Sequence, residues 1–385
     1  MNFIYADYAA TTPLDPRVLE AMMPSLTSVY FNATSAHAGG FQAQAAVMKS
    51  RMDVAGHIGA RYDEIIFTSG ATEAINLAIA GLAVAAQAAE STRRTLVSVR
   101  SEHAAVRDAV ERCGHEGFEI RWLPVDADGR VIMTEAERMI DDSVLLVSVM
   151  LVNNETGLIQ DVTSIAELAH RRGALFMTDA TQAYGKIPID VDTMGIDLMA
   201  FSGHKIYGPK GIGALYLRRG LAGSVQPIMV GGGQENGLRS GTLNVPGIVG
   251  LAAAGTIALQ ERAHEMSRIA GLRDRFERAL VDAADVFINC RDADRSPTIS
   301  SVTFGETPAE RILMELDAVL CSKGSACSTS KPKPSPVMIA MGRSEEQAHA
   351  TLRFSFGRTT TDDEIDRLIH LVTSAARKMS AIHQS

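Results

Sequence analysis

Short apolar runs alternate with helical patterns over the first two thirds of the chain. Runs rich in β-branched and aromatic residues predict strands at 65–68, 95–99, 144–149, 174–178, 198–201 and 214–217. Between several of these runs, apolar residues recur at helical spacing and predict helices at 75–88, 104–116 and 165–172. This alternation indicates an α/β fold with a mostly parallel sheet covered by helices on both faces. Functional groups are then expected at the ends of the strands.

The pattern changes after Pro246. A long helical stretch with mixed charges covers 246–284, short strands lie around 299–304, and helices follow near 309–315 and at 362–381. These elements predict a smaller α+β domain. The run Lys-Pro-Lys-Pro-Ser-Pro at 331–336 predicts a rigid loop, because proline fixes φ and lacks an N–H donor.

Composition narrows the class of protein without deciding its fold. The chain of 385 residues is 46% hydrophobic and 21% charged, an ordinary mix for a globular protein. Its net charge of −8 argues against binding to nucleic acid or to an anionic membrane. The N-terminus lacks a signal-peptide pattern, and Asn76 and Gln87 interrupt the most apolar stretch, at 74–89. Four scattered cysteines show no metal-ligand spacing, so we expect reduced thiols in a soluble, cytoplasmic protein without a metal.

Two charged residues stand at the ends of predicted strands. Lys205 follows a short turn after the strand at 198–201, and Asp179 ends the strand that begins at 174. A lysine amine that can form a Schiff base, with a carboxylate that can pair with a pyridinium nitrogen, is the minimal equipment for binding pyridoxal phosphate (PLP). The alternatives are a surface lysine at a strand end and an aspartate that caps a helix.

Further residues suit the binding of anions and nucleophilic chemistry. The segment Ser69–Thr72 lies between a strand and a helix, where backbone N–H groups suit a phosphate, although Thr72 could serve only its own helix. Arg353 presents a planar fork that can hold a substrate carboxylate, and Arg358 is the rival candidate or a surface ion-pair residue. Cys327 lies in a run of small polar residues that predicts an accessible nucleophilic loop; an incidental thiol is the alternative.

Nine segments carry a family resemblance, in order, over nearly the whole chain. They are Asp7–Pro13, Thr68–Glu73, Glu102–His103, Val152–Gly157, Thr178–Gln182, Ser202–Gly211, Arg239–Thr242, Gly324–Cys327 and Leu352–Ser355. Together they resemble the motifs of the cysteine desulfurases, PLP enzymes of the class V aminotransferase group. The sequence around Cys327 is similar to that of the family members whose catalytic loop is long.

The resemblance implies a fold and a division into domains. It implies PLP fold type I, similar to aspartate aminotransferase, with a large PLP-binding domain at 13–255 built on a mostly parallel seven-stranded sheet. The smaller α+β domain would comprise 1–12 and 256–385 and carry the catalytic cysteine loop at about 321–336. Family members are homodimers, and Thr242 matches a position that reaches the phosphate bound by the neighbouring subunit.

The resemblance also implies roles for individual side chains. Cys327, Lys205 and His103 would be catalytic, with Arg353 and Asn154 binding the substrate carboxylate. The residues implied to bind PLP are Lys205, Ala71, Thr72, His103, Asn154, Asp179, Gln182, Ser202, His204 and Thr242. For His103 a purely structural role is the alternative, and for Asn154 a turn role.

The implied activity is the removal of sulfur from L-cysteine. L-alanine would leave, and a persulfide on Cys327 would pass to an acceptor protein such as an iron–sulfur scaffold or a tRNA-thiolation protein. Three alternatives stay open: a selenocysteine lyase, an aminotransferase and a non-catalytic PLP-binding partner. The chain departs from the family at Asn32–Ser35, which lacks a frequent proline, and at Lys323, where serine is frequent. Neither departure touches the implied cofactor residues.

Overall fold

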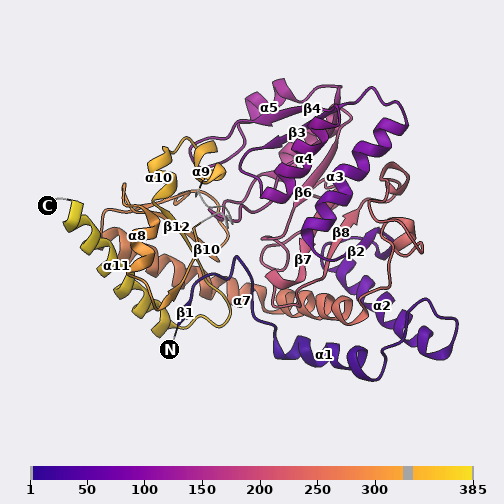
Figure 1. Cartoon of the computed structure of the whole chain (residues 1–385), viewed down its shortest axis with the longest axis horizontal. Coiled ribbons are helices and arrows are strands. Elements are labelled where there is room, and N and C mark those ends of the chain that lie inside the picture. The colour runs from indigo at the N-terminus through magenta and orange to yellow at the C-terminus, as the bar shows by residue number, and fades with distance from the viewer. Residues whose placement is uncertain (1–2, 324–332, 384–385) are drawn as a thin grey trace.

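The apolar runs form the strands of a central sheet, with a second lobe beside it (Figure 1). The structure is a computed structural model that describes residues 3–323 and 333–383. Its strands are β1 (Ile4–Tyr5), β2 (Ile65–Thr68), β3 (Thr95–Val99), β4 (Glu119–Leu123), β5 (Val144–Ser148), β6 (Leu175–Asp179), β7 (Leu198–Ser202), β8 (Gly213–Leu217), β9 (Phe287–Ile288), β10 (Ile299–Thr303), β11 (Val319–Leu320) and β12 (Thr351–Ser355). Its α-helices are α1 (Pro16–Thr27), α2 (Ala38–Gly56), α3 (Ala71–Ala88), α4 (Ala104–His115), α5 (Met133–Met139), α6 (Val162–Arg171), α7 (Val245–Ala283), α8 (Ala309–Met314), α9 (Pro336–Ala340), α10 (Glu345–His349) and α11 (Asp362–His383).

The central sheet has seven strands in the order β2-β8-β7-β6-β5-β3-β4. Only β8 runs against the others within this sheet, because it pairs antiparallel with both β2 and β7. The mostly parallel seven-stranded sheet is therefore confirmed. Strand β4 was not among the predicted strands. It lies at the edge of the sheet, where Glu119 and Arg121 face solvent, so its sequence lacks a continuous apolar run.

Helices cover both faces of this sheet, as predicted. Helices α3 and α4 bury one face, where Leu96 packs, whereas α2, α6 and the first half of α7 bury the other, where Val97 packs. Successive residues of a strand point to opposite faces, so β3 contributes to both cores. Among the described residues, α3 is the one helix long and apolar enough to cross a membrane, but its apolar side chains are packed in the core beneath the sheet.

The second lobe has its own core. An antiparallel sheet in the order β12-β10-β9 and the parallel pair β1-β11 pack against α8, α11 and the second half of α7. The predicted smaller α+β unit thus includes the N-terminal strand β1. Helix α7 extends unbroken along both lobes (Figure 1), with Leu251 in the first core and Phe276 in the second. The predicted boundary at 255/256 falls inside this helix, and the exact domain division stays a prediction.

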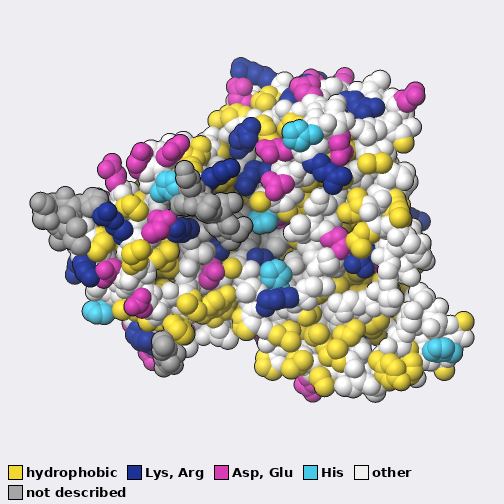
Figure 2. Space-filling model, viewed as in Figure 1, with side chains coloured by type: hydrophobic (Ala, Val, Ile, Leu, Met, Phe, Trp, Pro, Cys, Tyr) yellow, Lys and Arg dark blue, Asp and Glu magenta, His cyan; other side chains and the backbone are white. Residues whose placement is uncertain are grey.

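Two helices outside the predicted set, α1 and α2, lead into the large lobe. Asp15 accepts a hydrogen bond from the Arg17 N–H, and Pro16 stands at the first helical position. An aspartate cap followed by proline is a helix-start signal that is readable in the sequence. Helix α1 presents apolar side chains to solvent, and Figure 2 shows hydrophobic groups gathered along this lower edge; they include Leu19, Met23 and Leu26.

Candidate active site

A cavity of about 790 Å³ lies between the two lobes. Lys and Arg side chains gather on the molecular face around it (Figure 2); Arg100, Arg107 and Lys333 line it. The segments that follow β3, β5, β6 and β7 all reach it, because the carboxyl ends of parallel strands meet at one edge of the sheet. From the second lobe, Arg353 of β12 completes the wall. We call this space the front cavity.

Lys205 lies in a 3₁₀ turn, Gly203–Lys205, that begins directly after β7. Its Nζ donates hydrogen bonds of 2.7 Å to the backbone oxygens of Ala9 and Ala10, so the N-terminal segment holds this amine at the cavity wall. Burial, and next the charge of Arg353, lower the pKa of Lys205 to about 8, against the opposing charges of Asp179 and Asp7. The interpretation as a solvated surface lysine is wrong, and a neutral amine is accessible near physiological pH.

Asp179 ends β6 and is buried at the cavity wall. Its Oδ1 accepts a hydrogen bond of 2.8 Å from the Thr181 N–H, within a turn rather than at the start of a helix. The helix-capping alternative is therefore wrong. Gln182 lies in the same turn, and its Nε2 donates to the Ala9 oxygen at 2.8 Å. A carboxylate and an amide thus line one wall of the cavity.

The N-terminus of α3 opens onto the cavity through Ala71 and Thr72. The residue before the helix is Gly70, which offers no side-chain cap, so the N–H groups of the first turn remain available to an anion. Thr72 is consequently not the cap of its own helix. Ser202 lies next to this turn, because a Cβ placed on Gly70 would stand 3.6 Å from the Ser202 Oγ.

Two histidines border the cavity. His103 caps α4, and its Nδ1 accepts a hydrogen bond of 3.1 Å from the Ala105 N–H, so the Nε2 carries the ring proton when the ring is neutral. His204 contacts the Thr11 hydroxyl through Nδ1 at 3.0 Å. Burial and the charge of Lys205 lower the pKa of His204 to about 4, so this ring is neutral near pH 7. His103 thus has a structural contact in addition to its place at the cavity.

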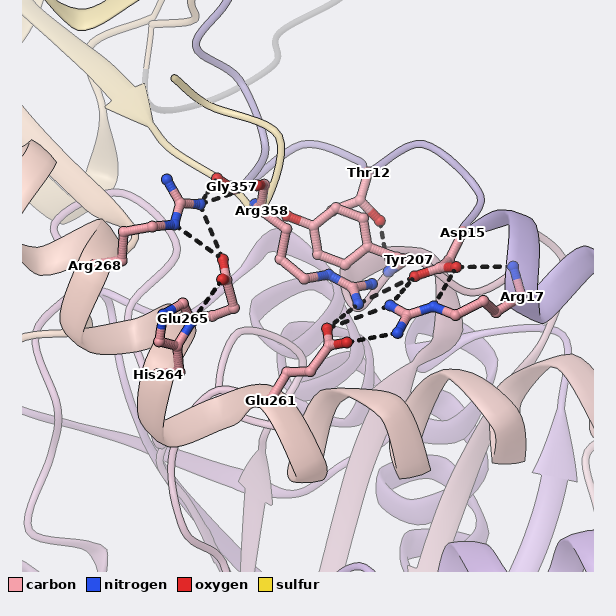
Figure 3. Close-up of polar contacts among 10 residues, drawn as sticks. All are labelled: Thr12, Asp15, Arg17, Tyr207, Glu261, His264, Glu265, Arg268, Gly357 and Arg358. Atoms are coloured by element: carbon pink, nitrogen blue, oxygen red, sulfur yellow. Dashed lines mark hydrogen bonds and ion pairs between the residues drawn. The ribbon is translucent and has the colours of Figure 1, made fainter. Parts of the chain in front are cut away.

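Arg353 is buried with part of its guanidinium unsatisfied. Nη2 donates to Asp7 Oδ1 at 2.8 Å and to Ser322 Oγ at 2.7 Å, and Nη1 donates to the Asn154 oxygen at 2.8 Å. Among the described residues, the Arg353 Nε has no hydrogen-bond partner, and neither has the side-chain oxygen of Asn154. The rival, Arg358, does not line the front cavity; it pairs with Asp15 and Glu261 (Figure 3). The geometry therefore favours Arg353 as the carboxylate ligand.

Glu102 is a cavity residue for which the sequence interpretation assigned no role. It is fully buried, and its Oε1 accepts a hydrogen bond of 2.6 Å from the Met150 N–H. Its Oε2 has no partner in the part of the chain that the structure describes. Burial, and next the charge of Asp179, raise the pKa of this carboxyl group well above its usual range. The signal available in the sequence was its position beside His103 in a matching segment.

Two of the implied residues are not among the described residues that line the front cavity. Thr242 is exposed and lines no part of the front cavity of its own chain. Cys327 lies outside the described residues. Its nearest described neighbours in the sequence, Lys323 and Lys333, bracket that segment, and Lys333 lines the cavity. Cys321 is a poor nucleophile, since burial, and next Asp7, raise its pKa to about 12.

The residues around the cavity fit PLP in their chemistry. An amine, a buried carboxylate and a helix N-terminus match its aldehyde, ring nitrogen and phosphate. Within residues 3–323 and 333–383, four buried polar atoms that belong to cavity residues also lack partners: the Asn154 Oδ1, Thr181 Oγ1, Glu102 Oε2 and Arg353 Nε. Buried polar groups without partners are rare in folded proteins, and a polar ligand would satisfy them.

Comparison with known proteins points to one family. A model of the aminotransferase class-V family matches residues 4–368. The curated relatives include the cysteine desulfurase IscS of Cronobacter sakazakii, 45% identical over 98% of this chain and 93% of the relative, and that of Klebsiella pneumoniae, 44% identical with the same coverage. Among solved structures, a NifS-like protein is 34% identical with a TM-score of 0.89, covering 98% of this chain and 99% of its own. The structure of SspA in complex with cysteine is 36% identical with a TM-score of 0.81, covering 91% and 98%.

Proposed function

The chain belongs to the aminotransferase class-V family and, within it, to the PLP-dependent cysteine desulfurases, and from this membership we propose that it removes sulfur from L-cysteine. The observation that carries the proposal is the convergence of Lys205, Asp179 and Arg353 on one cavity. These side chains come from different strands and from both lobes. An amine of lowered pKa, a buried carboxylate and a guanidinium with a free N–H suit an amino-acid substrate on PLP.

The cofactor would be held by groups on three sides of the cavity. Lys205 would bind the aldehyde through its Nζ, Asp179 would accept a hydrogen bond from the ring nitrogen, and the N–H groups of Ala71 and Thr72 would bind the phosphate. Ser202, His204, His103, Asn154 and Gln182 would complete the set. When bound, PLP supplies an electrophilic aldehyde carbon and a protonated ring that accepts electron density from the substrate Cα.

Arg353 would orient the substrate by its carboxylate. Its Nε is free, and its Nη2 is shared between Asp7 and Ser322, so a carboxylate approaching the Nε–Nη2 edge finds one open donor and one exchangeable contact. The unpartnered Asn154 Oδ1 lies at the same wall and would accept from a substrate N–H. Lys205, as a neutral amine, would then take the proton from the substrate Cα.

Cys327 is our proposed sulfur acceptor. Its thiolate would attack the substrate sulfur, forming an S–S bond as the C–S bond of L-cysteine breaks. The electron pair of the C–S bond remains with the carbon skeleton, which takes up a proton and leaves as L-alanine. L-cysteine and the Cys327 thiol thus become L-alanine and the Cys327 persulfide, with no external oxidant. An aminotransferase would not need this thiol.

The wider setting of the reaction is also a proposal. The persulfide would pass to an acceptor protein, such as an iron–sulfur scaffold or a tRNA-thiolation protein, in the cytoplasm. The chain would act as a homodimer, because Thr242 is exposed and is not among the described residues that line its own front cavity, which suits a residue that serves the partner's site. The net charge of −8 supports neither nucleic acid nor membrane as a partner.

Two variants separate cofactor binding from sulfur transfer. We expect Cys327→Ala to keep the visible absorbance of bound PLP and to lose sulfide and alanine production from L-cysteine under reductant. We expect Lys205→Ala to lose that absorbance and both products. The measurement is a spectrum of each purified variant together with parallel assays of sulfide and alanine, with Cys113→Ala, a buried thiol remote from the cavity, as the control.

Wild-type rates of sulfide release from Cys327→Ala would show that another group takes the sulfur. Keto acid formation with little sulfide would favour an aminotransferase. Strong discrimination against L-cysteine in favour of selenocysteine would identify a selenocysteine lyase. A wild-type protein that binds PLP but releases neither sulfide nor alanine would be the non-catalytic alternative.

A further inference from the structure

A second, smaller cavity lies behind Lys205. It has a volume of about 30 Å³, and Lys205 lines both it and the front cavity. We call it the rear cavity. It has room for about two water molecules and none for a cofactor. A second lysine, Lys186, lines the rear cavity and is largely buried, although no family segment drew attention to it.

Hydrogen bonds connect the two lysines through one glutamine. Lys186 Nζ donates to Gln182 Oε1 at 2.8 Å, and Gln182 Nε2 donates to the Ala9 oxygen at 2.8 Å. The same Ala9 oxygen accepts the hydrogen bond of 2.7 Å from Lys205 Nζ. Gln182 and Ala9 line the front cavity, whereas Lys186 lines the rear one. This chain of hydrogen bonds, which we call the relay, therefore connects Lys186 in the rear cavity with Gln182 and Ala9 in the front cavity.

The chemistry of the two contacts determines which way the Gln182 amide faces. A backbone oxygen can only accept, so the Ala9 oxygen must meet the amide nitrogen, and the Lys186 amine donates to the amide oxygen on the other side. The Oε1 of Gln182 is consequently held toward Lys186, and the Nε2 toward the front cavity. One N–H of this nitrogen is used by Ala9, and the other can serve a ligand.

The two glutamates of the rear cavity are already paired with arginines. Glu261 binds Arg17 and Arg358, and Glu265 binds Arg268 (Figure 3). Tyr8, Tyr207 and Arg262 complete the titratable or charged groups that face this space, besides the two lysines. Neither glutamate is therefore the partner of Lys186. Burial, followed by the charges of Lys205 and Arg353, lowers the pKa of Lys186 to about 7.

We propose that Lys186 is a positioning residue of the cofactor site, which holds the Gln182 amide with its nitrogen toward the front cavity. The inference rests on the proposed PLP site, where this N–H would donate to the oxygen on the cofactor ring. Without Lys186, the buried Gln182 Oε1 loses its partner, and an amide that turns its oxygen toward the ring oxygen would repel it. Lys186 itself contacts neither PLP nor substrate.

The test is a titration of PLP-free protein with PLP, followed by its visible absorbance. We expect Lys186→Met to raise the dissociation constant of PLP about tenfold, which is the effect of losing one hydrogen bond to a charged group. We expect the pH midpoint of the visible band to move upward by about half a unit, because a negative ring oxygen loses a donor and a nearby cation. Lys186→Arg keeps a hydrogen-bond donor, and the rear cavity has space for the larger side chain. Its dissociation constant and pH midpoint should therefore lie close to those of the wild type.

A double-mutant cycle excludes a merely structural role. Gln182→Ala should change the dissociation constant of PLP and the pH midpoint of the visible band as Lys186→Met does. Adding Lys186→Met to Gln182→Ala should then change neither quantity further. Lys49→Met, which removes an exposed lysine remote from both cavities, should match the wild type. The melting temperature of each variant, measured alongside, reports whether it is folded.

Three outcomes would overturn the inference. One is a folded Lys186→Met protein with the wild-type dissociation constant and pH midpoint. A second is additivity of Lys186→Met and Gln182→Ala, which would mean that the lysine does not act through the glutamine. The third is a wild-type protein that develops no visible band with PLP, and this result alone would remove the proposed cofactor site as well.

Discussion

At the scale of single residues, two arginines near the end of β12 differ in what surrounds them. Arg353 faces the front cavity with a free Nε and a shared Nη2. Arg358 is held away from that cavity: it pairs with Asp15 at 3.1 Å and with Glu261 at 2.9 Å, and its guanidinium stacks 3.8 Å from the Tyr207 ring centroid. Arg353 can therefore bind a ligand in the front cavity, whereas Arg358, with two carboxylate partners outside that cavity, holds elements together.

The same substitution at both positions should therefore have different effects. We expect Arg353→Lys to raise the KM for L-cysteine roughly 10- to 100-fold, because an ammonium cannot hold a carboxylate by two parallel hydrogen bonds. Arg358→Lys should lower the melting temperature, through loss of the stacking on Tyr207, and leave the KM unchanged. Steady-state kinetics and thermal unfolding of both variants are the measurements; a raised KM in Arg358→Lys alone would reverse the assignment.

At the scale of elements, the phosphate end of the site depends on a close approach of two backbones. Gly213 begins β8 and is paired with Thr68 of β2 and with Ser202 of β7. A Cβ at this glycine would lie 2.5 Å from the Phe201 oxygen and 2.7 Å from the Gly70 Cα. Both contacts are backbone atoms, which cannot rotate away. The absence of a side chain here sets the turn that leads into α3.

We expect Gly213→Ala to push that turn away from β7 and to weaken PLP binding at least about tenfold, since overpacking of this kind costs about 1–3 kcal/mol. Gly223→Ala is the matched control, because a Cβ there meets nothing within 4 Å. The dissociation constant of PLP, measured for both variants, checks the prediction. Equal affinities for the two would mean that the turn before α3 does not position the phosphate.

At the scale of the whole molecule, His57 joins three segments that are distant in the sequence. It follows α2, its Nδ1 contacts the hydroxyl of Tyr184 at 2.7 Å, and its Nε2 contacts that of Thr256 on α7 at 3.0 Å. Burial lowers the pKa of His57 from 6.5 to about 4. Above pH 6.5 the ring is neutral in both the folded and the unfolded chain, so its titration leaves the free energy of unfolding unchanged there.

Acid should therefore destabilise the fold through this ring. As the pH falls from 6.5 to about 4, the unfolded chain binds a proton that the folded chain excludes, so the free energy of unfolding declines. At pH 5 the loss from His57 is at most about 2 kcal/mol. We expect the free energy of unfolding of His57→Gln to decline less between pH 7 and pH 5 than that of the wild type. Urea unfolding of the PLP-loaded proteins at both pH values measures this difference.

His115→Gln serves as the control for that experiment, because His115 is exposed in the last turn of α4. The free energy of unfolding of His115→Gln should decline between pH 7 and pH 5 as much as that of the wild type. If His57→Gln loses stability between pH 7 and pH 5 as steeply as His115→Gln, the buried ring is not the source of the acid sensitivity.

The sequence by itself determined the class of fold and most of the chemistry of this protein. The apolar runs at 95–99 and 198–201 form strands inside the sheet because a strand buried on both faces requires continuous apolar residues. The motif around Lys205 and the aspartate at 179 predicted the cavity residues because a cofactor needs those particular groups. Strand β4 escaped prediction because the charged side chains of Glu119 and Arg121 interrupt its apolar run.

Only the tertiary structure decided which groups act on one another. The choice between Arg353 and Arg358, the buried acid Glu102 and the relay from Lys186 all depend on burial and pairing. Lys205 is bonded to a backbone oxygen 196 positions earlier in the chain. The charge state and orientation of these side chains depend on such long-range contacts and on the exclusion of water. The local pattern of residues predicts neither.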